Sequence, residues 1–282
     1  MVTAELHAIA RKMVARNKGI LAADESNATM SKRLDSINVA STPESRRQWR
    51  QLLFQTQGIG DFISGVIMYD ETIRQSDDSG KRFVELLAMS DILSGIKVDK
   101  STHDLAGAPG EFITEGLDGL RDRLADYYSM GARFAKWRAL LTVGDGRPSD
   151  YAIHTNAHAL GRYAILCQEQ GLVPIVEPEI LMDGVHNIAD CRLATKRSLT
   201  VVFEELVAQS VDLSGIVLKP NMVISGSDAS NRASSTEVAR QTIDCLLETV
   251  PAEVPGVAFL SGGQGDEESV VNLDEINKIA NS

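Results

Sequence analysis

The lysine at position 219 has the placement in the chain that most directly suggests chemistry. It ends the apolar run Gly215-Ile216-Val217-Leu218, and Pro220 follows at once. A run of this kind is typical of a buried strand, and a proline cannot continue its hydrogen-bond ladder because it has no N–H. An ammonium group at the end of a buried strand is costly unless the strand ends at a polar site. The sequence therefore predicts a functional site around Lys219.

A lysine close to a second lysine and to carboxylates is suited to forming an imine with a ketone. An exposed lysine is almost wholly protonated near neutral pH, but burial and a neighbouring positive charge favour the neutral amine that attacks a carbonyl. Lys136 is a candidate for that charge, and Glu177 and Asp24 are candidate proton carriers. The iminium would be an electron sink for breaking an adjacent C–C bond. The alternative is a structural ion pair of Lys219 with Glu177 or Glu179.

Strand-like and helix-like segments alternate along the chain. We expect strands at 19–25, 62–70, 94–99, 132–137, 173–179, 214–219 and 256–261. Helical character is found at 46–57, 81–93, 117–131, 154–171, 191–210 and 235–250. Alternation of this kind predicts βαβ units and a parallel sheet.

The last four strand ends follow one another at nearly constant intervals of about 42 residues. This spacing favours a closed (β/α)8 barrel of the TIM type over a doubly wound sheet, which the spacing does not exclude. Seven βα units are encoded, and no Pro/Gly/Ser-rich linker divides the chain, so we expect a single domain over 1–282.

Charged residues concentrate at the carboxyl ends of the expected strands, which is where barrel enzymes place their sites. In Ala135-Lys136-Trp137-Arg138 and Ile96-Lys97-Val98-Asp99 the ionisable side chains alternate, so each pair faces one way. Inward-facing charges need partners, and we expect them to pair across the barrel mouth.

A glycine-rich segment, SGGQG at 261–265, lies between the last expected strand and a helix. Glycines let backbone N–H groups converge on an anion, and the start of a helix adds a favourable dipole. Phosphate sites in barrels often follow late strands. The segment therefore predicts a phosphate site at Ser261, Gly262 and Gly263.

Composition excludes several classes of protein. The net charge of −11 argues against a general binder of nucleic acid or anionic membranes. Three widely spaced cysteines indicate reduced thiols, and no long apolar stretch is present, so we expect a soluble cytoplasmic protein. His154 and His158 are four residues apart but lack the HExxH pattern, so we expect neither a metal site nor a cofactor.

Several of these segments together resemble one enzyme family. The matching motifs occur in the family's order: KGILAADES (18–26), KRLDSI (32–37), GIKVDK (95–100), FAKWR (134–138), VPIVEPEIL (173–181), LKPNM (218–222) and FLSGGQ (259–264). They span nearly the whole chain and resemble class I fructose-bisphosphate aldolase, the metal-free type that works through a Schiff base. The resemblance implies cleavage of fructose 1,6-bisphosphate to dihydroxyacetone phosphate and glyceraldehyde 3-phosphate, in glycolysis and gluconeogenesis.

The resemblance also implies roles for single residues. Lys219 would form the imine, Glu177 would carry the proton in its formation, and Glu179 would support it. Asp24 would take the C4 hydroxyl proton. The remaining implied site residues bind phosphate or tune the charge of the site: Ser26, Arg33, Lys97, Lys136, Arg138, Ser261, Gly262 and Gly263.

The chain departs from the family pattern after the glycine loop. It stops at NKIANS, so we expect it to lack the family's eighth strand and C-terminal tail, and to be truncated or a fragment. A catalytically impaired, aldolase-like binding or assembly protein is therefore an alternative, and a transaldolase-like lyase is a weaker one. The expected partner is a sugar phosphate, with a homo-oligomer, a tetramer in the family, possible.

Overall fold

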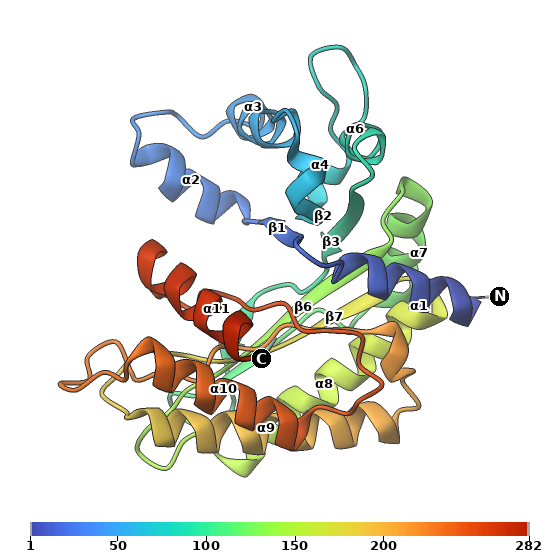
Figure 1. Cartoon of the computed structure of the whole chain (residues 1–282). Helices are drawn as coiled ribbons and strands as arrows, with labels where there is room; N and C mark the ends of the chain where they lie inside the picture. The colour runs from blue at the N-terminus through green and yellow to red at the C-terminus, as the bar shows by residue number, and fades with distance from the viewer. Residues whose placement is uncertain (1, 281–282) are drawn as a thin grey trace.

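The computed structural model describes residues 2–280, in which helices and strands alternate (Figure 1). The strands are β1 Gly19–Ala23, β2 Ile63–Met68, β3 Leu93–Lys97, β4 Thr102–Asp104, β5 Phe112–Thr114, β6 Phe134–Leu141, β7 Val173–Ile180 and β8 Val217–Leu218. The longer helices are α1 Val2–Met13, α2 Asn27–Asp35, α3 Pro43–Phe54, α6 Phe83–Met89, α7 Leu120–Met130, α8 Asp150–Glu169, α9 Ile188–Ala208, α10 Ser235–Thr249 and α11 Asp266–Ala280. Single-turn helices are α4 Ile59–Phe62, α5 Asp70–Ile73 and the 3₁₀ turn Leu213–Gly215.

The main sheet is parallel, with six strands in the order β1-β2-β3-β6-β7-β8. Strand order follows chain order, as in a barrel and unlike a doubly wound sheet. Helices α8 and α9 pack against β7 and against each other, and α10 covers α9 (Figure 1). The fold is therefore a curled parallel half-barrel with helices on its outer face.

The expected barrel of seven βα units is corrected in two places. Segment 256–261 is not a strand, because Val257 makes only an isolated bridge to Leu218. Segment 214–219 shortens to the two residues of β8, since Leu213–Gly215 forms a 3₁₀ turn and Pro220 has no N–H to donate. Because β8 has only two residues, segment 256–261 has few positions at which it can pair, and the regular sheet ends at β8.

Helix α1 closes the amino-terminal end of the half-barrel. Leu6, Ile9 and Met13 are buried in one cluster with residues of β2, β6, β7 and β8. Phe134 fills the centre of that end, and a Cβ placed on Gly95 would lie 2.1 Å from its ring. A glycine is therefore required at this position of β3, because any side chain would displace the ring.

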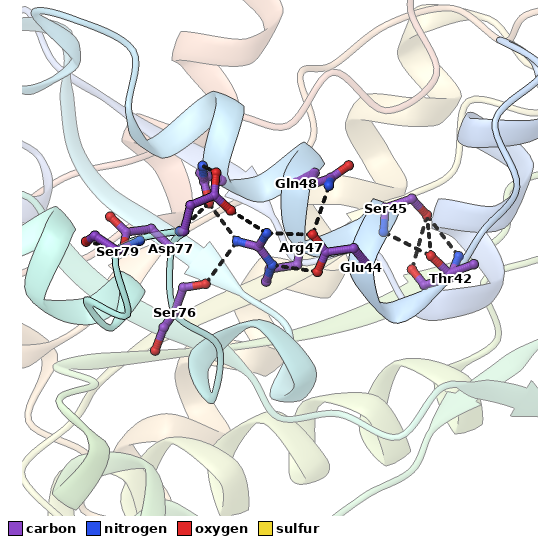
Figure 2. A network of polar contacts seen from close by, with 10 residues as sticks. Thr42, Glu44, Ser45, Arg47, Gln48, Ser76, Asp77 and Ser79 are labelled. Carbon is purple, nitrogen blue, oxygen red and sulfur yellow. Dashed lines mark hydrogen bonds and ion pairs between the residues drawn. The ribbon is translucent and has the colours of Figure 1, made fainter.

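The remaining expected helices form close to their predicted ranges, and local hydrogen bonds explain their limits. The start of α3 carries a capping box between Thr42 and Ser45 (Figure 2). Arg47 on the same helix binds Glu44 and Asp78 with N–O distances of 2.6 Å, which ties α3 to the loop before α6 (Figure 2). Helix α2 and the β4–β5 hairpin were absent from the sequence-based expectation.

Candidate active site

Alternate residues of β6 and β7 carry the charged groups of the site. The two strands pair in parallel, with Arg138 opposite Glu177 and Leu140 opposite Glu179. Because side chains alternate along a strand, Lys136 and Arg138 face the inside of the curled sheet. Trp137 faces outward instead, and its ring lies 5.6 Å from that of Tyr163 on α8.

One buried carboxylate joins the two lysines of the site. Lys136 Nζ lies 3.4 Å from Glu177 Oε2, and Lys219 Nζ lies 2.5 Å from Glu177 Oε1. Lys136 Nζ also donates to Asp24 Oδ2 at 3.0 Å. The Glu177 side chain is only 3% exposed, so these charges interact in a medium that screens them weakly. Asp24, Lys136, Glu177 and Lys219 are far apart in sequence, and these contacts link them in one continuous ionic network.

Two groups of this network, Lys136 and Asp24, have shifted pKa values that keep them charged near neutral pH. Burial opposes the charge of Lys136, but the Glu177 and Asp24 carboxylates outweigh it and raise the pKa of Lys136 above its usual value. Burial also opposes the charge of Asp24, and the Lys136 ammonium outweighs it and lowers the pKa of Asp24. Near neutral pH, Lys136 is therefore protonated and positively charged, and Asp24 is ionised and negatively charged.

The backbone of β8 fixes Lys219 at the mouth of the half-barrel. Lys219 N donates to Val176 O at 2.8 Å, the last backbone bond from this strand to β7 before Pro220. The Lys219 side chain is 13% exposed and its ammonium points to Glu177. The ion pair of the alternative interpretation is therefore present, and it lies in the same cluster as Lys136 and Asp24.

Two further ion pairs flank the central cluster. Arg138 Nε lies 2.5 Å from Glu179 Oε2, and Lys97 Nζ lies 2.5 Å from Asp99 Oδ1. The Lys97 charge also contributes to the lowered pKa of Asp24, after the larger effects of burial, Lys136 and Lys219. The predicted pairing of charges across the mouth therefore occurs, mostly between residues of neighbouring strands.

A cavity of about 360 Å³ opens beside these groups. Its lining combines residues of β6, the end of β7 and the glycine loop: Lys136, Arg138, Glu177, Glu179, Leu181, Asp183, Leu260, Ser261, Gly262 and Gly263. Gly262 and Gly263 have φ values of 64° and 89°, which side-chain-bearing residues rarely adopt. The glycines thus let the backbone turn at the wall of the cavity, next to the ammonium and guanidinium groups.

Two buried side-chain amides form hydrogen bonds that stabilise the glycine loop. Gln264 Nε2 donates to Ser261 O at 2.7 Å, and Asn272 Nδ2 of α11 donates to Gln264 Oε1 at 2.7 Å. Both side chains are buried. Gln264 was visible in the sequence as part of SGGQG, yet its burial and its bond to the loop appear only in the structure.

Ser26 and Arg33 lie on α2 and not in the cavity lining. Ser26 Oγ accepts from Thr29 N at 3.3 Å and so caps the helix. Arg33 is half-exposed and binds Glu25, whose other oxygen lies 2.9 Å from Nη2 of the buried Arg50. Two sequence-predicted residues are therefore set apart from the central cluster, and Arg33 is occupied by a carboxylate.

Residues 2–280 contain no group of three or more His, Cys, Asp or Glu side chains placed to hold a metal ion. His158 instead lies 3.2 Å from Glu205 of α9. No helix in the same range combines the length and apolar character that crossing a membrane requires. Sequence reasoning gave no role to Asp183, which lines the cavity, since a single aspartate in a loop carries no pattern.

Comparisons with known proteins agree with this geometry. The sequence model of the family "Fructose-bisphosphate aldolase class-I", described as glycolytic, matches residues 5–282. A probable fructose-bisphosphate aldolase class 1 of Xanthomonas campestris is 52% identical over 98% of this chain and 83% of its own. The cytosolic fructose-bisphosphate aldolase 4 of Arabidopsis thaliana is 52% identical over 98% of this chain and 70% of its own.

A solved structure shares the fold over almost the whole chain. It is the fructose-bisphosphate aldolase of Plasmodium falciparum, crystallised with TRAP and a small-molecule inhibitor. Its TM-score is 0.97 at 47% identity, covering 99% of this chain and 81% of that one. The half-barrel, the buried lysine–carboxylate cluster and these matches lead to one conclusion: the chain belongs to the class I fructose-bisphosphate aldolase family.

Proposed function

We propose that this chain cleaves fructose 1,6-bisphosphate through an imine on Lys219. The observation that carries the proposal is the 2.5 Å contact between Lys219 Nζ and Glu177 Oε1. A carboxylate at that distance can take a proton from the ammonium and release the amine that attacks the C2 ketone. Family membership supports lyase activity on this substrate.

Glu177 serves twice in this scheme. Having accepted the Lys219 proton, it returns a proton to the hydroxyl of the carbinolamine, which leaves as water and yields the iminium. Lys136, held cationic by Asp24 and Glu177, places a second positive charge on the carboxylate that binds Lys219. The Glu177 carboxylate between the two lysines supports this division of roles.

Bond cleavage uses Asp24 as the base. Asp24 removes the C4 hydroxyl proton, the C3–C4 electron pair moves into the iminium, and glyceraldehyde 3-phosphate leaves. The enamine takes up a proton at C3, and the proton that Asp24 accepted from the C4 hydroxyl balances it. Water then hydrolyses the resulting iminium to dihydroxyacetone phosphate and free Lys219. The pKa of Asp24, which burial raises and the nearby lysines lower by more, supports an ionised carboxylate, the form in which it can act as a base.

We propose two phosphate contacts. We assign the one-phosphate to Ser261, Gly262 and Gly263, and the cations Lys136 and Arg138 in the same cavity lining support this. We assign the six-phosphate to Arg33 and Ser26 at α2, and we assign Lys97, with Arg138 and Glu179, to tuning the charge of the site. Binding there requires Arg33 to exchange its Glu25 partner for phosphate.

We also propose the domain organisation, the oligomeric state and the cellular location. Ala258 N donates to Leu218 O at 2.9 Å, which supports a seventh position for segment 256–261 in a single barrel domain over 1–282. We propose a homo-oligomer, in keeping with the family resemblance. Buried free cysteines and the cytosolic plant relatives support a cytoplasmic location.

Reductive trapping tests the proposal. Borohydride added with dihydroxyacetone phosphate is expected to leave a stable adduct on the peptide that contains Lys219. Lys219→Arg keeps the positive charge but removes the usable nucleophile, so it should give no adduct and no cleavage above background. An adduct on Lys136 in place of Lys219, or none at all in the unaltered chain, would disprove the assignment.

A further inference from the structure

The edge of β7 that faces β8 carries few hydrogen-bond donors. The backbone N–H and C=O groups of its even-numbered residues point toward β8, as the bond from Lys219 N to Val176 O shows. Those of its odd-numbered residues point toward β6, as the bond from Leu181 N to Leu141 O shows. Pro174 and Pro178 fall on the β8 edge and have no N–H. Beyond Val176, Ile180 is therefore the next residue of β7 able to donate toward β8.

The acceptor for Ile180 comes from a side chain. Ile180 N donates to Asn221 Oδ1 at 3.1 Å, in a buried environment. Asn221 lies two residues after Lys219, directly beyond Pro220, where the backbone ladder of β8 has ended. Its side-chain oxygen thus serves as the acceptor for Ile180 N in place of a backbone carbonyl of β8.

The other end of the Asn221 amide is also fully engaged. Nδ2 donates to Met222 O at 3.0 Å and to Thr195 Oγ1 of α9 at 3.1 Å. Because Ile180 N can only donate and Met222 O can only accept, the amide has one possible orientation. Asn221 is 4% exposed, so a side chain lacking either function would leave a buried partner unpaired.

The Ile180–Asn221 hydrogen bond lies a few residues along the chain from both Glu177 and Lys219, the two residues proposed to exchange a proton. Ile180 follows Glu179 and lies three residues from Glu177, and Asn221 lies two residues from Lys219. We propose that Asn221 is a positioning residue that fixes the carboxyl end of β7 against that of β8, and so holds Lys219 Nζ on Glu177. The inference rests on the proposed imine function and adds a residue to it.

The expected effect falls on chemistry more than on binding. A displacement on the order of 1 Å can slow a positioned reaction about 100-fold. We expect Asn221→Leu, which keeps the volume but leaves Ile180 N and Met222 O unpaired, to slow imine trapping by that order. KM should change little, because the phosphate groups are assigned to α2 and to the 261–263 loop.

A milder variant keeps the test valid if Asn221→Leu folds poorly. Thr195→Val retains the shape of the residue and removes only one acceptor of Asn221 Nδ2. It should slow trapping roughly two- to tenfold, the range of one neutral hydrogen bond. The matched control is Asn156→Leu, a buried asparagine whose Nδ2 donates to Phe112 O and Ala152 O, away from the strand ends.

The experiment measures the rate of borohydride trapping with dihydroxyacetone phosphate on Lys219, per folded molecule, well below each variant's Tm. The result that supports the inference is slow trapping in the Asn221 and Thr195 variants, with a normal rate in Asn156→Leu. Trapping at the normal rate in either of the first two variants, beside normal labelling of the unaltered chain, would overturn it. A lack of labelling in the unaltered chain would instead overturn the proposed function, and the inference with it.

Discussion

Lys136 and Lys219 bind opposite oxygens of one buried carboxylate, that of Glu177, at 3.4 Å and 2.5 Å. Neither lysine is isolated, yet they differ in their other contacts. Lys136 has a second carboxylate partner, Asp24, whereas Lys219 has Glu177 alone among the ion pairs of the described residues. This asymmetry is consistent with the proposed roles, in which Lys136 stays charged and Lys219 forms the imine.

Glu177→Gln should slow the reaction without abolishing substrate binding. The amide cannot accept the Lys219 proton, and loss of a positioned proton carrier costs about 10²- to 10⁴-fold in rate. Steady-state cleavage should show kcat reduced by that factor and KM within a fewfold of normal. Glu71→Gln is the control, because Glu71 pairs with Arg46 outside the cavity; an equal loss in both variants would contradict the prediction.

Asp24→Asn should change how stability depends on pH. The pKa of Asp24 is lowered in the folded protein, so its stabilising effect is full above its ordinary value of 3.8 and is lost as pH falls through the folded value. The Tm of the unaltered chain should exceed that of the variant at pH 7, and the gap should close toward pH 3. Asp35→Asn, on the exposed side of α2, should show no such convergence.

Gly263→Ala should weaken substrate binding. Gly263 has φ 89°, which costs a side-chain-bearing residue roughly 1–2 kcal/mol, and the new methyl would lie 3.1 Å from Met182 Sδ. We expect KM to rise about tenfold, since 1.4 kcal/mol corresponds to that factor. Gly265→Ala provides the comparison, because no atom lies within 4 Å of its Cβ position. A normal KM in both variants would show that the loop does not bind the phosphate.

Arg33→Met should separate the two phosphate ends. If Arg33 leaves Glu25 to bind the six-phosphate, its loss should raise KM for fructose 1,6-bisphosphate about tenfold or more, in line with a charge-assisted bond of roughly 1.5–3 kcal/mol. The KM for fructose 1-phosphate should stay the same, because that substrate lacks the group. Lys32→Met on the same helix controls for lost surface charge, and equal effects on both substrates would refute the assignment.

Dialysis against EDTA should leave cleavage activity unchanged. The electron sink in the proposed scheme is the Lys219 iminium, so no step depends on a divalent ion. Assays before and after chelation, with and without added Zn²⁺ or Mg²⁺, test this directly. Activity that disappears with EDTA and returns with metal would show that the carbonyl is polarised in another way.

The sequence indicated the charged ends of β6 and β7 because their pattern is local. Alternation in Ala135-Lys136-Trp137-Arg138 is a property of four consecutive residues, and the backbone of a strand converts it directly into an inward-facing pair. The helical segment 154–171, which α8 Asp150–Glu169 largely covers, was recognisable in the same way. These features needed no knowledge of the rest of the fold.

The extent of the strands was decided by partners. Residues 256–261 are as apolar as β3, yet they form a single bridge, because β8 offers only Val217 and Leu218 as a ladder. Pairing is a contact between distant segments, and its length depends on both. The sequence alone therefore overestimated the number of strands in the main parallel sheet, which has six and not seven.

The sequence by itself determined which residue types reach the mouth of the half-barrel, since strand alternation and the position of Pro220 fix where each side chain points. Only the tertiary structure decided which of them bind one another. Glu177 serves two lysines, Glu25 occupies Arg33, and Asn221 replaces a missing backbone acceptor of β8. Such pairings depend on distances of a few ångströms between segments far apart in the chain, and the folded packing of the strands sets those distances.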